Sequence, residues 1–223
     1  MTPHVRSTNI AVPKPVPGSR AARPRRSGID KRPAAGLEVF APGDGYGHGS
    51  GVVGDLVGNS KHHGGAQKAV YAYAREELDH WQRECGRSFS DGFFGENLTT
   101  EGIDLESLII NQRAQIGTAL LEVSVARTPC ATFAAHVAEP GWTKRFATRG
   151  RSGTYFRVLE PGTIRPGDAI ELLDAPGHEL DIRTLFAAAM GDDGAARIAV
   201  AARCLPPMYH ERFAERLSSR QTA

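Results

Sequence analysis

A thiol is the first group in this sequence that could carry chemistry. Cys130 follows a predicted strand and the run Arg-Thr-Pro. Thr128 suits the cap of a helix and Pro129 its first position, so we predict that Cys130 lies in the first turn of a short helix. Free N–H groups at a helix start stabilise a thiolate, and Arg127 acts in the same direction. The alternative is a buried, inert cysteine.

Imidazoles and glycines form a second group, His62-His63-Gly64-Gly65. The glycines allow the backbone to approach a ligand closely, and a histidine here could donate a proton or hold an oxyanion. Apolar residues recur at helical spacing from 66 to 85, which predicts a helix whose first N–H groups face an anion. The alternative is a surface loop whose histidine only caps that helix. Adjacent histidines make a metal site only with ligands from elsewhere in the chain.

Basic and amide side chains complete the set. Lys31 lies in an early loop, and Arg149 and Arg157 fall in a run dense in arginine, which predicts a wall that holds phosphate. Asn97, in a Gly-Glu-Asn turn, could orient a ligand amide or cap the turn. For each of these residues a solvated surface position is the competing interpretation.

The elements that must position these residues are mostly strands, followed by helices. Hydrophobic periodicity predicts a β-rich body over residues 1–176 and three helices in residues 177–223, so the fold class is α+β. The predicted strands are 5–12, 37–41, one within 105–126, 154–159 and 169–173. The predicted C-terminal helices are 182–190, 195–203 and 209–217.

Composition narrows the class of protein. The 223 residues are 40% hydrophobic and 23% charged, which is ordinary for a globular chain with a buried core. The longest apolar runs fall short of the roughly 20 residues that span a bilayer, and the first residues do not resemble a secretory signal. Three cysteines at unrelated spacings argue against a disulfide framework, so we expect a cytoplasmic protein. Residues 1–33 are basic but contain few aromatic residues, and we expect no nucleic acid partner.

Taken in order, the motifs resemble those of the MOSC domain family, named after the C-terminal domain of molybdenum-cofactor sulfurase. The three-helix tail is similar to that of its YiiM-like subgroup. The resemblance covers nearly the whole chain. It is carried by residues 27–31, 62–65, 94–98, 127–130, 153–158 and 166–168.

The resemblance implies a mainly β body with a barrel-like form over residues 1–176, and binding of the molybdenum cofactor (molybdopterin). It implies that Cys130 contacts molybdenum, because a soft thiolate suits this metal. It also implies that His63 and Lys31 complete the catalytic set. The implied cofactor-binding residues are His62, Gly64, Gly65, Asn97, Arg127, Arg149 and Arg157.

By the same resemblance, the function would be an oxidoreductase that reduces N-hydroxylated compounds such as 6-hydroxylaminopurine. Electrons would come from a reductase partner, because the sequence shows no flavin or nicotinamide motif. One alternative is a non-catalytic carrier of the cofactor or of sulfur. Another is a zinc-dependent hydrolase that uses His62, His63 and Cys130. No pyridoxal-phosphate domain is visible, so sulfuration of the cofactor by this chain alone is not expected, and a homodimer is one open oligomeric state.

Overall fold

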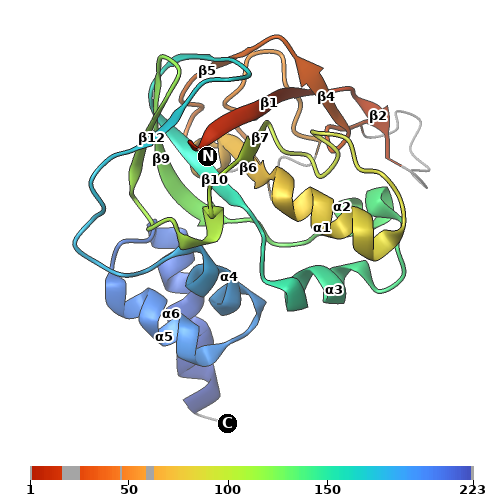
Figure 1. The fold of residues 1–223 in the computed structure, drawn as a ribbon. Helices are drawn as coiled ribbons and strands as arrows, with labels where there is room; N and C mark the ends of the chain where they lie inside the picture. Colours follow the sequence, from red (N-terminus) through yellow and green to blue (C-terminus); the bar gives the residue numbers. More distant parts are fainter. Residues whose placement is uncertain (1, 17–25, 46, 59–62, 222–223) are drawn as a thin grey trace.

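One large mixed sheet organises the protein (Figure 1). The structure, a computed structural model, describes residues 2–16, 26–45, 47–58 and 63–221. Eight strands pair in the order β12-β8-β9-β10-β6-β7-β1-β4, and only β6 and β7 run parallel. These strands are β1 (His4–Ala11), β4 (Lys31–Ala34), β6 (Val70–Ala74), β7 (Leu98–Glu101), β8 (Arg113–Ile116), β9 (Ala119–Ala126), β10 (Thr154–Glu160) and β12 (Ile170–Leu172). Two small sheets pair β2 (Lys14–Pro15) with β3 (Arg26–Ser27) and β5 (Leu37–Val39) with β11 (Gly162–Ile164).

The predicted α+β class is confirmed, but the described residues do not form a closed barrel. The sheet ends at β12 and β4. Its curl brings the start of β1 against the segment before β12, where His4 and Ala169 form an isolated bridge. The N–H of Val5 also donates to the carbonyl of Asp168 at 2.9 Å. This one bridge and a few backbone hydrogen bonds join the two regions, whereas a closed barrel needs a continuous ladder between paired strands.

The predicted helix over residues 66–85 is wrong in its first half. A short 3-10 helix (Ala66–Lys68) leads into β6, and the helix α1 begins only at Arg75 and ends at Cys85. All five residues of β6 are buried, so its apolar run matches a helix face as well as a central strand. The aromatic and β-branched side chains in Val-Tyr-Ala-Tyr-Ala are the signal for a strand.

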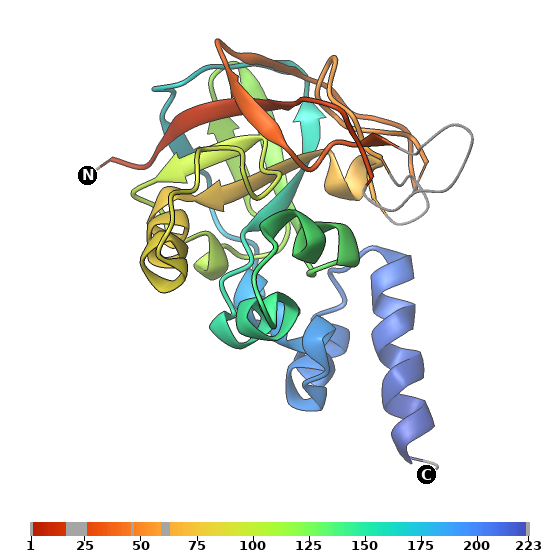
Figure 2. The same cartoon turned by 90° about the vertical axis from the view of Figure 1, so that its right-hand side faces the viewer.

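Aromatic rings pack the helices that surround the site. The helices α2 (Ala131–Val137) and α3 (Trp142–Arg149) lie below the sheet, as α1 does (Figure 2). The ring of Trp81 lies 4.6 Å from that of Trp142, and the ring of Phe94 lies 5.1 Å from that of Phe133. Edge-to-face contacts of this kind favour one arrangement of the rings. They therefore fix the loop before β7 against the start of α2.

The C-terminal helices agree closely with their predicted ranges. They are α4 (Ile182–Met190), α5 (Asp193–Ala202) and α6 (Pro207–Gln221). Asp181 caps α4 by accepting a hydrogen bond from the N–H of Thr184 at 2.7 Å. The ring of Phe186 contacts Phe146 of α3, so the tail shares the core of the body. A domain boundary at residues 176/177 therefore stays a prediction. Within the described residues, every helix is too short or too polar to cross a bilayer.

Candidate active-site cavity

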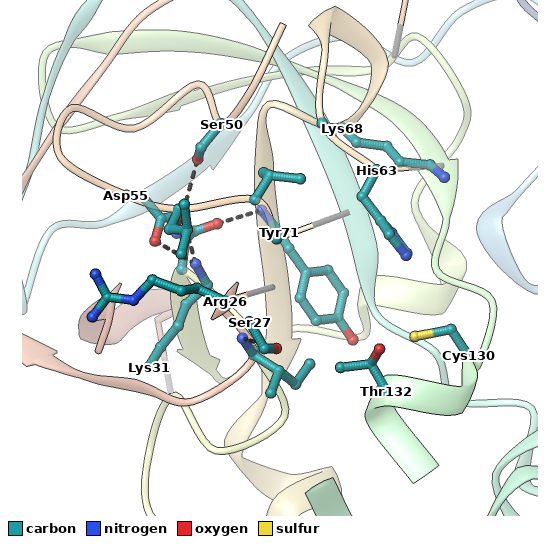
Figure 3. Close-up of a pocket in the computed structure, with 18 of the residues that line it drawn as sticks. Arg26, Ser27, Lys31, Ser50, Asp55, His63, Lys68, Tyr71, Cys130 and Thr132 are labelled. Carbon is teal, nitrogen blue, oxygen red and sulfur yellow. Dashed lines mark hydrogen bonds and ion pairs between the residues drawn. The ribbon is translucent and has the colours of Figure 1, made fainter. Parts of the chain in front are cut away.

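One cavity brings together most of the residues singled out from the sequence. It encloses about 780 Å³, including the space at its opening. Figure 3 shows the sulfur of Cys130, the ring of His63 and the hydroxyl of Tyr71 turned toward the same space, with Lys31 and Asp55 on the opposite side. The predicted site residues that line it are Lys31, His63, Gly64, Asn97, Arg127 and Cys130. Lining residues that the sequence analysis did not identify include Arg26, Ser50, Asp55, Lys68, Tyr71, Thr132 and Tyr155.

A buried ion pair forms one side of the cavity. The ammonium of Lys31, whose residue is only 5% exposed, lies 2.6 Å from Oδ1 of Asp55. Asp55 also accepts hydrogen bonds from the hydroxyl of Ser50 at 2.9 Å and from the N–H of Ala11 at 2.9 Å. Burial alone would raise the pKa of Asp55, but Lys31, the side chain of Asn97 and the N–H of Ala11 hold it below its usual value. The pair fixes the position of the Lys31 ammonium, while burial lowers the pKa of Lys31 and Asp55 opposes that shift.

Asn97 connects this pair to the sheet. Its side-chain amide donates to Oδ2 of Asp55 at 3.0 Å, and its side-chain oxygen accepts from the N–H of Tyr71 at 3.2 Å. Its own N–H donates to the carbonyl of Tyr71 at 2.8 Å, and its carbonyl accepts from the N–H of Asn9 at 2.7 Å. Because the side-chain amide is fully used within the protein, Asn97 orients Asp55, and the expected contact with a ligand amide stays a prediction.

The helix begins two residues later than predicted, so Cys130 precedes its first turn instead of lying in it. The helix α2 begins at Ala131, and Cys130 is its cap residue, with extended backbone angles of φ −128° and ψ 164°. Thr128 is not the cap, and no side chain caps this helix. The cap position turns the sulfur away from the helix and toward the cavity (Figure 3).

Arg127 lines the cavity and is only 5% exposed. Its Nη1 donates to the carbonyl of Phe94 at 2.7 Å and to the hydroxyl of Tyr71 at 3.4 Å. The guanidinium lies 3.7 Å from the centre of the Phe133 ring, a cation–π contact with the helix that follows Cys130. All these partners are neutral.

Packing accounts for the two glycines after His63. Gly64 and Gly65 adopt positive φ values of 80° and 78°. A Cβ at Gly64 would lie 2.3 Å from the carbonyl oxygen of Gly49, and one at Gly65 would lie 1.8 Å from that of Gly45. The N–H of Gly65 donates to Gly49, and no α-helix starts here, so the predicted anion site at a helix terminus is wrong. Gly65 does not line the cavity, and His62 lies outside the described residues.

The structure does not bring the predicted arginine wall to this cavity, because Arg149 and Arg157 do not line it. Arg149 makes two hydrogen bonds of 2.9 Å to the carboxylate of Glu77. Arg157 pairs with Glu122 at 3.0 Å. Arg149 of α3 and Arg157 of β10 lie close together in sequence, but each pairs with an acid on a different element. A run of arginines in the sequence does not indicate where those acids lie.

Two tyrosines and a lysine form a surface that the sequence analysis missed. Tyr71 of β6 and Tyr155 of β10 are register partners, and their ring centres lie 4.9 Å apart. The ammonium of Lys68 lies 5.8 Å from the centre of the Tyr155 ring. Recognising β6 as a strand would have placed Tyr71 on the cavity, whereas its pairing with Tyr155 depends on the sheet register.

A buried acid lies behind the cavity wall. Glu96 is 0% exposed, and its Oε1 accepts from the N–H of Gly92 at 2.6 Å and from the hydroxyl of Thr99 at 3.0 Å. Its Oε2 has no hydrogen-bond partner among the described residues. Burial raises the pKa of Glu96 to about 7.

Comparisons with known proteins agree with this architecture. YflK of Bacillus subtilis (strain 168), an uncharacterized protein, is 35% identical over 147 residues, which are 66% of this chain and 63% of YflK. A protein named reductase from Gibberella moniliformis is 36% identical over 131 residues, 57% of this chain and 23% of that protein. The chain thus spans less than two thirds of the curated relatives it matches.

A solved structure and a family model extend these matches. The crystal structure of YiiM from Geobacillus stearothermophilus matches with a TM-score of 0.75 and 28% identity, over 96% of this chain and 99% of that one. The family model described as MOSC domain matches residues 59–171, about half of the chain. The chain therefore belongs to the MOSC domain family, and it is YiiM-like.

Proposed function

We propose that this protein is a molybdenum-cofactor-dependent oxidoreductase that reduces N-hydroxylated compounds such as 6-hydroxylaminopurine. Membership of the MOSC family and the similarity to a protein named reductase support the reaction class. The observation that carries the proposal is the thiol of Cys130, which opens into a cavity with basic and aromatic side chains on its walls.

The residues present fit the cofactor. A thiolate is a soft ligand that suits molybdenum, and the cavity also contains Arg26 and Lys68, whose charges suit the phosphate of the pterin. In the part of the chain that the structure describes, no three His, Cys, Asp or Glu side chains gather to hold a metal ion. In this proposal Cys130 is the metal's ligand from the described residues, and the remaining ligands come from the cofactor. When bound, the cofactor supplies the two-electron chemistry that cleaves an N–O bond.

The side chains around Cys130 position the substrate and move protons. His63 faces the same space as the sulfur, so in our proposal it donates a proton to the departing hydroxyl oxygen. Because Asp55 holds the ammonium of Lys31, Lys31 steadies the leaving oxygen in our proposal and His63 supplies the proton. Overall, R–NHOH, two electrons and two protons give R–NH₂ and water, with the electrons supplied by a reductase partner.

A metal analysis combined with an assay tests this function. Protein produced with ample molybdate is analysed for molybdenum and zinc, next to the Cys130→Ser variant, and is then incubated with 6-hydroxylaminopurine and a chemical reductant. We expect molybdenum in the unmodified protein, its loss from the variant, and formation of adenine only by the unmodified protein. Cofactor binding without turnover would instead support the carrier, and zinc in place of molybdenum would support the hydrolase.

A further inference from the structure

Tyr71 places a hydroxyl in the cavity whose only proton is already used by the protein. A tyrosine hydroxyl has one proton to donate and lone pairs that can accept. The hydroxyl of Tyr71 donates this proton to the carbonyl of Ser152 at 2.7 Å. It also accepts a hydrogen bond from Nη1 of Arg127 at 3.4 Å, because a guanidinium can only donate. Toward a ligand, this hydroxyl can therefore act only as an acceptor.

The carbonyl that takes the proton is held from the other side of its peptide group. The N–H of Gly153 belongs to the same planar group as the Ser152 carbonyl, and it donates to Oε1 of the buried Glu106 at 2.9 Å. Gly153 also packs closely on β6, since a Cβ there would lie 2.3 Å from the carbonyl oxygen of Ala72. The peptide group therefore cannot turn away from Tyr71 without breaking these contacts.

The hydroxyl of Tyr71 also stays neutral when it faces a ligand. The residue is buried, and burial raises the pKa of Tyr71 above its usual value, while Arg127 has a smaller opposing effect. Tyr71 still lines the cavity, and its hydroxyl is turned toward the space that it shares with the sulfur of Cys130 (Figure 3). A donor group on a ligand in this space gains a hydrogen bond from the tyrosine oxygen, whereas an acceptor meets only a lone pair.

We propose that Tyr71 is a specificity-determining residue that accepts a hydrogen bond from the N–H of the substrate, and that it favours hydroxylamines of the form R–NHOH over N,N-disubstituted ones. This inference rests on the proposed function, which sets the class of substrate. In that function His63 protonates the departing oxygen, so the N–H is the donor that remains for another wall of the cavity. A methyl group on the nitrogen removes this donor and leaves the tyrosine oxygen without a partner.

Phenylhydroxylamine and N-methyl-N-phenylhydroxylamine are the probes, because they differ only at the nitrogen. Cofactor-loaded protein is incubated with each compound and with reduced methyl viologen as electron donor, and the amine product is measured by chromatography. Titration calorimetry without the reductant gives the Kd of each compound. We expect the unmodified protein to favour phenylhydroxylamine about tenfold, both in kcat/KM and in affinity.

Two tyrosine variants separate this hydrogen bond from effects on the fold. In Tyr71→Phe we expect kcat/KM and affinity to fall about tenfold for phenylhydroxylamine and to stay within about twofold for the N-methyl compound, so that the preference disappears. Tyr73→Phe is the matched control. Tyr73 lies on the same strand and is also buried, and its hydroxyl accepts from Nε1 of Trp81 at 3.0 Å, but it does not line the cavity. We expect Tyr73→Phe to keep the preference of the unmodified protein.

The Tyr71 assignment is overturned if the unmodified protein binds neither compound or binds both equally. It is also overturned if Tyr71→Phe keeps the tenfold preference, which would assign that preference to the size of the methyl group. An equal loss for both compounds in Tyr71→Phe, or loss of the preference in Tyr73→Phe, would assign the effect to the fold. Binding with the expected preference but without an amine product would support the role of Tyr71 and contradict the proposed function.

Discussion

The two sides of the cavity differ in whether their buried cation is paired with an acid. The paired wall consists of Lys31, Ser50, Asp55 and Asn97, and the thiol wall consists of His63, Arg127, Cys130 and Thr132. In the paired wall the ammonium meets a carboxylate that also accepts hydrogen bonds from a hydroxyl, an amide and a backbone N–H. In the thiol wall the cation contacts neutral groups.

This difference indicates different tasks. A fully paired wall has little unsatisfied charge to offer a ligand, but it holds four chain segments in place. A wall with an uncompensated cation favours an anion in the cavity, whether a thiolate or part of a ligand. We therefore expect changes to the paired wall to alter mainly stability, and changes to the thiol wall to alter mainly reactivity.

The largest expected effect comes from breaking the paired wall. Lys31→Met leaves Asp55 buried without its cation, and loss of one partner of a buried pair costs about 3–5 kcal/mol. Urea unfolding followed by circular dichroism measures the loss. The double variant Lys31→Met, Asp55→Asn removes both charges and should recover much of that free energy. A loss below about 1 kcal/mol in the single variant would mean that the pair is not structural.

The buried carboxyl group of Glu96, behind the paired wall, predicts that the free energy of unfolding depends on pH. The pKa of Glu96 is raised from 4.5 to about 7, so the folded state binds more protons than the unfolded state between these values. The free energy of unfolding should therefore fall as pH rises from 4.5 to 7, by up to about 3 kcal/mol, and then level off. Denaturant titrations at several pH values measure this.

Glu96→Gln is the test of that assignment. The variant should lose part of the decrease between pH 4.5 and 7, because the amide does not ionise. A residual slope should remain, since burial also raises the pKa of Glu106 to about 7. An unchanged slope in Glu96→Gln would assign the effect to other groups.

The sequence predicted the thiol wall better than the paired wall. The turn residues around Cys130 and the Gly-Gly after His63 are local signals, and they identified residues that do line the cavity. Asp55 gave no such signal, since its partner Lys31 lies 24 positions away and meets it only after folding. The C-terminal helices were predicted closely because Asp181 and Gly191 mark the ends of α4.

The failures have a common physical cause. Residues 66–68 form a short 3-10 helix, and residues 70–74 form a strand that is buried throughout. The apolar spacing of this segment therefore did not distinguish a helix from a strand. Arg149 and Arg157 lie close together in sequence, but their carboxylate partners lie on two other elements, α1 and β9. In both cases the tertiary partner decides the outcome, and it does not appear in the local sequence.

A smaller effect is expected at the aromatic surface between the two walls. Stacking of a nucleobase on an aromatic side chain contributes about 1–3 kcal/mol. If the proposed substrate stacks on Tyr155, Tyr155→Leu should raise KM for 6-hydroxylaminopurine about tenfold, while Tyr155→Phe leaves it nearly unchanged. N-hydroxyurea, which has no ring, is the matched substrate. An equal rise in KM for both substrates would contradict stacking.

The smallest effect is expected from an arginine outside both walls. Arg149→Gln removes two hydrogen bonds to Glu77, but Arg151 still lies 3.1 Å from the same carboxylate. Partly exposed ion pairs contribute about 0–1 kcal/mol, so unfolding by urea should change by no more than that. A larger loss would show that Arg151 does not hold Glu77 in place when Arg149 is absent.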